Sequence, residues 1–239
     1  MTVLVIGANG AIGKACVNTI VHEVKVAVAD LTLPDFDVAE KHILNVRDEK
    51  AVSTLIKSLD RSEPLSGMIY AAGLNTTGPV DGIDWDVYEK VMAVNLRGAF
   101  HVGAALLSVM RDKPRSFSSV FIASTAGLVG EAGGTVYCAS KFGLIGFTQS
   151  FAGEIAEFGG RANVVCPGNV ESPMLKELAG AIGARSGKSG EATLSDWKNA
   201  SAFKRLITPQ EVAQTCSWLL SDSASGISGQ TIVVDGPKA

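Results

Sequence analysis

Tyr137 and Lys141 lie four residues apart in the stretch VYCASKFG (136–143), a spacing that puts both side chains on one face of a helix. The three residues between them are small, which would let a large ligand approach the backbone. A phenol with a pKa of about 10 is a poor base at neutral pH, but a neighbouring ammonium group favours the phenolate and lowers that pKa. The pair is therefore a candidate proton-transfer site with Tyr137 as the acid or base.

Ser124 supplies a second reactive hydroxyl. It is expected at the end of a buried strand (119–124), and open α/β sheets bind their ligands at such ends. There the hydroxyl would polarise a substrate carbonyl or stabilise an alkoxide. The three histidines are isolated along the chain and show no metal-ligand spacing, so we expect no metal in the reaction.

Gly7, Gly10 and Gly13 follow the first predicted strand and open the first predicted helix. Such glycines permit a tight turn and let the backbone and the helix N-terminus approach a pyrophosphate, although any strand-to-helix turn also favours glycine. Asp30 closes the next strand, VAVAD, at the spacing expected for a carboxylate that binds the adenosine ribose hydroxyls. A carboxylate repels a 2′-phosphate, and the neighbouring Leu31 is uncharged, so the sequence predicts NAD rather than NADP.

Short β-branched runs alternate with longer helical stretches along the whole chain. Predicted strands cover 3–6, 24–30, 42–46, 67–73, 119–124, 161–168 and 230–236, and predicted helices cover 11–21, 48–59, 84–110, 136–158 and 209–221. Apolar strands that alternate with helices imply an α/β fold with a Rossmann-like, doubly wound parallel sheet of about seven strands. We predict one domain, 1–239, with an irregular, mobile insertion at about 172–207.

Composition restricts the partners and the compartment. A net charge of −3 gives no electrostatic basis for binding nucleic acid, and no apolar run approaches the roughly 20 residues of a membrane span. The chain passes from Met1 directly into VLVIGANG without a basic stretch, so we expect no signal peptide and a cytoplasmic protein. The four widely spaced cysteines then predict buried free thiols rather than disulfides: Cys16, Cys138, Cys166 and Cys216.

The order of these motifs resembles the short-chain dehydrogenase/reductase family over essentially the whole chain. In that family a glycine-rich turn, an Asn, a Ser and a Tyr-x-x-x-Lys follow one another. Here they are GANGAIG (7–13), Asn95 in VNLRG, Ser124 in ASTAG, and Tyr137 with Lys141. The interval of 13 residues between Ser124 and Tyr137 also matches the family pattern.

The resemblance implies a role for each of these residues. Tyr137 is the general base in oxidation and the general acid in reduction, and Ser124 orients the reacting oxygen. Lys141 holds the ribose and lowers the pKa of the tyrosine, while Asn95 supports a water relay to Lys141. The segment 172–207 corresponds to the substrate-covering lid. With Tyr137 and Lys141, the implied cofactor contacts are Gly7, Asn9, Ala11, Ile12, Gly13, Asp30, Leu31, Asn45, Val46, Ala71, Ala72, Gly73, Pro167, Gly168, Val170 and Ser172.

Three departures from the family pattern bear on cofactor affinity. Ala11 stands where the middle glycine is usual, and Asn45-Val46 replaces a usual Asp-Val pair beside the adenine. YAAG (70–73) replaces Asn-Asn-Ala-Gly, so the Asn that braces the central strand is missing. None of the three removes a chemical group that hydride transfer needs.

We therefore expect an NAD-dependent oxidoreductase that interconverts a secondary alcohol and a ketone on a small molecule. The lid segment between Lys176 and Arg205 carries six basic and three acidic residues, which we interpret as a solvated helix pair; the alternative is that these charges attract an anionic substrate. The alternatives are a catalytically silent NAD-binding sensor or scaffold and, from the glycine spacing, a nucleotide-sugar epimerase or dehydratase. By analogy with the family we expect a homo-oligomer, a dimer or tetramer, formed through 84–110 and 136–158.

Overall fold

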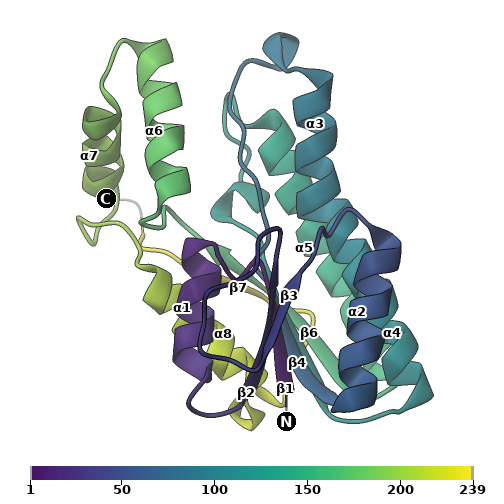
Figure 1. Cartoon of the computed structure of the whole chain (residues 1–239). Coiled ribbons are helices and arrows are strands. Elements are labelled where there is room, and N and C mark those ends of the chain that lie inside the picture. The colour runs from purple at the N-terminus through teal and green to yellow at the C-terminus, as the bar shows by residue number, and fades with distance from the viewer. Residues whose placement is uncertain (1, 238–239) are drawn as a thin grey trace.

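The computed structural model describes residues 2–237 and contains a seven-stranded sheet in the order β3-β2-β1-β4-β5-β6-β7 (Figure 1). All neighbouring strands are parallel. The strands are β1 (Thr2–Ile6), β2 (Lys25–Asp30), β3 (Glu40–Ile43), β4 (Leu65–Tyr70), β5 (Phe117–Ile122), β6 (Gly160–Pro167) and β7 (Thr231–Val234). The predicted Rossmann-like, doubly wound parallel sheet is confirmed.

Helices cover both faces of this sheet (Figure 1). One layer contains α1 (Ala11–Ile20) and α8 (Pro209–Leu220), and the other contains α2 (Glu49–Ser62), α4 (Gly98–Asp112) and α5 (Thr135–Ala156). Alternate residues of one strand enter the two cores: Val5 packs in the core under α1 and α8, and Leu4 packs in the core under the other layer. The continuous apolar runs of the strands follow from burial on both faces.

The long helix predicted over 84–110 consists of three consecutive segments. These are α3 (Trp85–Met92), a π-helical turn η2 (Ala93–Arg97) and α4. A π turn contains one residue more than the α-helical period allows, and the hydrophobic pattern around it did not predict the insertion. By length and composition alone, the run Trp85–Asp112 is long and apolar enough to cross a membrane, contrary to the expectation from the sequence. Half of its most apolar 18-residue stretch is buried inside the protein.

Two segments differ most from their sequence predictions. The segment 172–207 is not an irregular insertion but forms two helices, α6 (Pro173–Ser186) and α7 (Gly190–Ala200). The hydroxyls of Ser172 and Ser189 cap their first turns, and the left-handed Gly187 (φ 70°) ends α6. The strand predicted over 42–46 ends at Ile43, because the chain then turns inward and buries Leu44 and Val46.

The strand order determines where a ligand can bind. β1 lies between β2 and β4, and the connections from β1 and from β4 leave toward opposite faces of the sheet, α1 on one face and α4 on the other. In open parallel sheets the crevice at such a switch point, beyond the carboxyl ends of the strands, binds the ligand. The turn after β1, the end of β2 and the loops after β4, β5 and β6 all lie at this edge.

Candidate active site

The glycine turn after β1 is packed so tightly that two of its positions exclude any side chain. Gly7 has φ +84°, and a Cβ there would lie 2.4 Å from the backbone nitrogen of Ala72. A Cβ on Gly13 would lie 2.1 Å from the Gly7 carbonyl oxygen. Gly7 therefore lets the turn rest against the loop after β4, and Gly13 lets α1 begin directly over the turn.

The N-terminus of α1 is suited to a phosphate group. Its N-cap, Gly10, provides no capping side chain, and the first turn, which contains Ala11 and Ile12, has no acidic residue. By contrast, side chains cap α2, α3, α6, α7 and α8. Backbone N–H groups at the start of a helix attract anions. The glycine turn 7–13, called the glycine cradle below, and the uncapped start of α1 thus fit the pyrophosphate of a dinucleotide. Ala11, which replaces the usual glycine, does not disturb this turn.

Asp30 at the end of β2 is held against this turn. Its carboxylate accepts hydrogen bonds from the backbone N–H of Asn9 at 2.8 Å and from that of Leu31 at 2.6 Å. The side chain of Asn9 donates to the hydroxyl of Thr32 at 3.0 Å, a contact that the sequence did not indicate. These bonds fix a negative charge beside the glycine cradle, where the resemblance places the adenosine ribose.

The other residues expected to contact the cofactor divide into two groups. Five of them lie at the ligand-binding edge, because they end or directly follow a strand: Ala71, Ala72 and Gly73 follow β4, Pro167 ends β6 and Gly168 follows it.

The remaining four residues expected to contact the cofactor make structural contacts within the protein. Asn45 caps a turn through the N–H of Arg47, Val46 packs against Gly98, Val170 pairs with Ile207, and Ser172 caps α6.

Tyr137, Lys141 and Ser124 come together where β5 meets α5. The Ser124 hydroxyl lies near enough to the Tyr137 phenol to lower the pKa of that phenol. The Nζ atom of Lys141 lies 5.7 Å from the centre of the Tyr137 ring and donates a hydrogen bond of 2.9 Å to the carbonyl of Ile122. Lys141 is buried and Tyr137 is half-buried, so an ammonium group and a phenol share a largely dry environment.

Burial dominates the electrostatics of this pair. It raises the pKa of Tyr137 to about 12; the neighbouring Ser124 side chain acts in the opposite direction, and the charge of Glu131 raises the pKa further. Burial also lowers the pKa of Lys141 to about 8. In the protein without a bound cofactor, desolvation opposes both charged forms and outweighs any stabilisation of the phenolate, so the lowering of the phenol pKa by Lys141 stays a prediction.

Asn95 occupies the π-helical turn and is completely buried. Its Oδ1 accepts from the N–H of Leu74 at 2.7 Å, and its Nδ2 donates to the Leu74 carbonyl at 2.8 Å and to the Ser140 hydroxyl at 3.0 Å. A Cβ on Gly73 would lie 3.5 Å from Lys141 Nζ and 3.6 Å from Asn95 Oδ1. Glycine at this position thus keeps side-chain atoms out of the space between Asn95 and Lys141, through which a relay would run.

The helical segment 172–207, which we expect to be the lid and call the lid below, is joined to the rest of the protein by polar contacts. Arg185 of α6 donates to the hydroxyl of Thr77 at 2.6 Å and to the Thr77 carbonyl at 3.1 Å. The adjoining Gly78 donates its N–H to the carbonyl of Gly133, one residue before the N-cap of α5. Arg185 thus links the lid to the loop after β4, and that loop in turn is bonded to the loop that leads to Tyr137.

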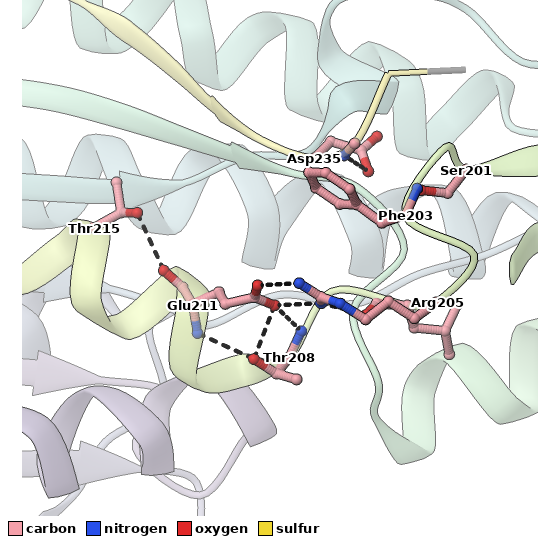
Figure 2. A network of polar contacts seen from close by, with 9 residues as sticks. Ser201, Phe203, Arg205, Thr208, Glu211, Thr215 and Asp235 are labelled. Atoms are coloured by element: carbon pink, nitrogen blue, oxygen red, sulfur yellow. Dashed lines mark hydrogen bonds and ion pairs between the residues drawn. The ribbon is translucent and has the colours of Figure 1, made fainter. Parts of the chain in front are cut away.

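The C-terminal end of the lid is anchored separately (Figure 2). Arg205 forms two hydrogen bonds with Glu211, at 2.6 Å and 2.9 Å, and its guanidinium group lies over the ring of Phe203. Glu211 also completes a capping box with Thr208 at the start of α8. The Arg205 ion pair and these bonds lower the pKa of Glu211 to about 2. The positive charge of Arg205 is therefore compensated within the protein by Glu211.

A dinucleotide-type turn and a Ser–Tyr–Lys group at one edge of a doubly wound sheet define a class of nicotinamide-dependent oxidoreductases. A family model described as enoyl-(acyl carrier protein) reductase, of the short-chain dehydrogenase/reductase type, matches residues 8–236. The chain belongs to the short-chain dehydrogenase/reductase family, whose members bind a nicotinamide cofactor.

Relatives and solved structures agree with this assignment. The 3-oxoacyl-[acyl-carrier-protein] reductase of Thermotoga maritima is 30% identical over 98% of this chain and 95% of its own. The sorbitol-6-phosphate 2-dehydrogenase of Erwinia amylovora superposes with a TM-score of 0.91 at 27% identity, covering 98% of both chains. The aldohexose dehydrogenase of Thermoplasma acidophilum gives a TM-score of 0.87 at 27% identity, covering 98% of this chain and 92% of its own.

Proposed function

We propose that the protein is an NAD-dependent oxidoreductase that interconverts a secondary alcohol and a ketone on a small molecule. One observation carries this proposal: Tyr137 lies beside Ser124 and the buried Lys141, at the sheet edge that also holds the glycine cradle. The relatives named above, an oxoacyl reductase and two sugar dehydrogenases, support the exchange between an alcohol and a ketone or aldehyde.

Each residue has a distinct task in the proposed reaction. A bound nicotinamide cofactor would supply the acceptor for a hydride from the alcohol carbon, or the donor of a hydride to the carbonyl carbon. Tyr137 takes the proton from the alcohol oxygen, or donates it to the carbonyl oxygen, and Ser124 holds that oxygen by a hydrogen bond. The Lys141 ammonium group stabilises the phenolate, and Asn95 with the Leu74 carbonyl supports the route by which the proton leaves.

Wild-type protein is expected to bind NADH at least about tenfold more tightly than NADPH, because the Asp30 carboxylate accepts ribose hydroxyls and repels a phosphate. Its fixed position beside Asn9 supports this preference. Titrating each reduced cofactor into the protein and following nicotinamide fluorescence measures both affinities. Equal affinities, or tighter binding of NADPH, would show that Asp30 does not select the cofactor.

Substrate screening distinguishes the alternatives. NADH formation from NAD across polyols, hydroxy acids and cyclic alcohols is the expected result for a dehydrogenase. A sensor or scaffold would bind NADH without turning over any member of the panel. A nucleotide-sugar epimerase or dehydratase would convert a nucleotide sugar without net release of NADH, because the hydride returns to the product.

The substrate is further proposed to be anionic, and Arg185 is the residue that supports this. Lys188 pairs with Asp196 at 2.6 Å and Arg205 pairs with Glu211, so acidic residues compensate both cations. Arg185 instead contacts only the neutral Thr77 among the partners that the described residues provide. Its uncompensated charge lies between the lid and the loop after β4, and a phosphate or carboxylate on the substrate would replace Thr77 as the acceptor.

Arg185→Gln is expected to raise KM for a phosphorylated substrate about tenfold, the effect of losing one charged hydrogen bond, and to leave KM for the unphosphorylated analogue unchanged. Sorbitol 6-phosphate and sorbitol form a suitable pair for initial-rate measurements. Lys188→Gln is the matched control, because it removes the same charge from the same lid. An equal rise for both substrates would mean that Arg185 only holds the lid.

The protein is also proposed to form a homodimer or homotetramer in the cytoplasm. Members of the family are commonly oligomeric. Phe100 of α4 is 52% exposed and Phe142 of α5 is 46% exposed, and both lie on the two helices expected at the interface. Sedimentation velocity should show an oligomer for the wild type and a shift toward monomer for Phe100→Glu. The four cysteines, all free and buried as predicted, support a reducing compartment.

A further inference from the structure

We propose that Tyr70 is a positioning residue for the active site: its hydroxyl holds the π-helical turn 93–97 in the form that directs Asn95 to Leu74 and Ser140. The catalytic part of this inference rests on the proposed function, whereas the structural part does not. Tyr70 ends β4 and begins YAAG (70–73), the segment in which the family usually has the bracing Asn. The sequence therefore indicated that the brace was missing, but the structure shows a phenol that contacts the helix.

The contact is a short hydrogen bond inside the core. Tyr70 is fully buried, and its Oη donates to the carbonyl of Val94 at 2.6 Å. In an α-helix the N–H of Gly98 would donate to this carbonyl, four residues earlier. In the π turn the Gly98 N–H donates to the Ala93 carbonyl instead. Val94 thereby loses its α-helical donor, and the Tyr70 hydroxyl satisfies a carbonyl that would be costly to bury unpaired.

Gly98 is the partner that makes room for this hydroxyl. A Cβ on Gly98 would lie 2.4 Å from the Tyr70 Oη and 3.0 Å from a methyl group of Val46. Any larger residue at 98 would displace the phenol from the Val94 carbonyl. Tyr70 and Gly98 therefore act as a matched pair on the two sides of one contact.

The π turn determines where Asn95 points. Each helical residue advances by about 100° around the axis, so a turn with one residue more or fewer would rotate Asn95 away from its partners. In the present form both amide atoms of Asn95 are used, Oδ1 by the Leu74 N–H and Nδ2 by the Leu74 carbonyl and the Ser140 hydroxyl. Leu74 directly follows Gly73, the glycine that faces both Asn95 and Lys141. Loss of the Tyr70 hydroxyl should therefore loosen Asn95 and its hydrogen bonds to Leu74.

Hydrogen exchange tests the structural part without any substrate. In Tyr70→Phe the amide of Leu74, which Asn95 protects, is expected to exchange about five- to tenfold faster than in the wild type, the effect of one lost hydrogen bond. The amide of Ala123, bonded to Val165 across β5 and β6, is the internal reference and should not change. Tyr88→Phe removes the same hydroxyl from α3 and should leave Leu74 protected. An unchanged Leu74 rate, or an equal acceleration in Tyr88→Phe, would overturn the proposal.

Kinetics tests the catalytic part. Tyr70→Phe is expected to lower kcat about five- to tenfold and to leave the affinity for NADH unchanged, because the hydroxyl acts through Asn95 and not on the cofactor. Gly98→Ala should give the same kcat defect, and adding it to Tyr70→Phe should lower kcat no further. Additive losses, or a change in NADH affinity without one in kcat, would refute the positioning role. If the wild type turns over no substrate, the proposed function fails, but the Leu74 amide still decides whether Tyr70 positions Asn95.

Discussion

Tyr137→Phe is expected to lower kcat about a thousandfold while the protein still binds NADH with wild-type affinity. Removal of a general acid–base group commonly has an effect of this size, and phenylalanine preserves the ring that packs beside Lys141. Initial rates on the best substrate of the panel measure the loss, and nicotinamide fluorescence measures the retained affinity. Tyr88→Phe, which removes a phenol hydroxyl from α3, is the matched control and should keep its activity.

The pH dependence supplies a second test of the same role. Burial raises the pKa of Tyr137 to about 12, so the phenol must give up its proton before it can accept one from the alcohol. Alcohol oxidation is therefore expected to accelerate as the pH rises, and carbonyl reduction to accelerate as it falls. A variant that lacks the hydroxyl should lose both dependences. Substantial activity in Tyr137→Phe with an unchanged profile would assign the proton transfer to another group.

Gly7→Ala is expected to destabilise the protein by about 2–4 kcal/mol and to abolish NADH binding. Gly7 has φ +84°, which an alanine adopts only with strain, and the added Cβ would lie 2.4 Å from the backbone of Ala72. Backbone atoms cannot rotate away as a side chain can, so β1 and the loop after β4 would have to separate. Urea denaturation gives the change in the free energy of unfolding, and cofactor fluorescence gives the binding.

The matched control for Gly7 is Gly153 on α5. A Cβ there meets no atom within 4 Å, and the residue lies in a helix, where alanine is favoured over glycine. Gly153→Ala is therefore expected to keep full activity and to raise the free energy of unfolding by up to about 1 kcal/mol. If Gly7→Ala proved as stable as Gly153→Ala and bound NADH normally, the close contact between the turn and Ala72 would not be required.

Local patterns predicted most of the fold. Strand runs such as VAVAD and helix starts such as Asp48 before α2 depend on neighbours in the sequence, so alternation and capping residues indicate them directly. The same patterns failed over 172–207. There a high content of Gly, Ser and Lys suggested irregular chain, although Ser172 and Ser189 are both N-caps that could have been read as the starts of α6 and α7.

The sequence by itself determined the fold class and the candidate residues of the site, because motif spacing is a local property: a glycine turn after a strand, an acid after the next strand, and a tyrosine one helical turn before a lysine. Only the tertiary structure decided how these groups behave. Burial opposes the expected acidity of Tyr137, acidic partners neutralise Lys188 and Arg205 but not Arg185, and Tyr70 braces a π turn 24 residues further along the chain. Desolvation, ion pairing and side-chain packing depend on residues that are distant in sequence and become neighbours only when the sheet assembles.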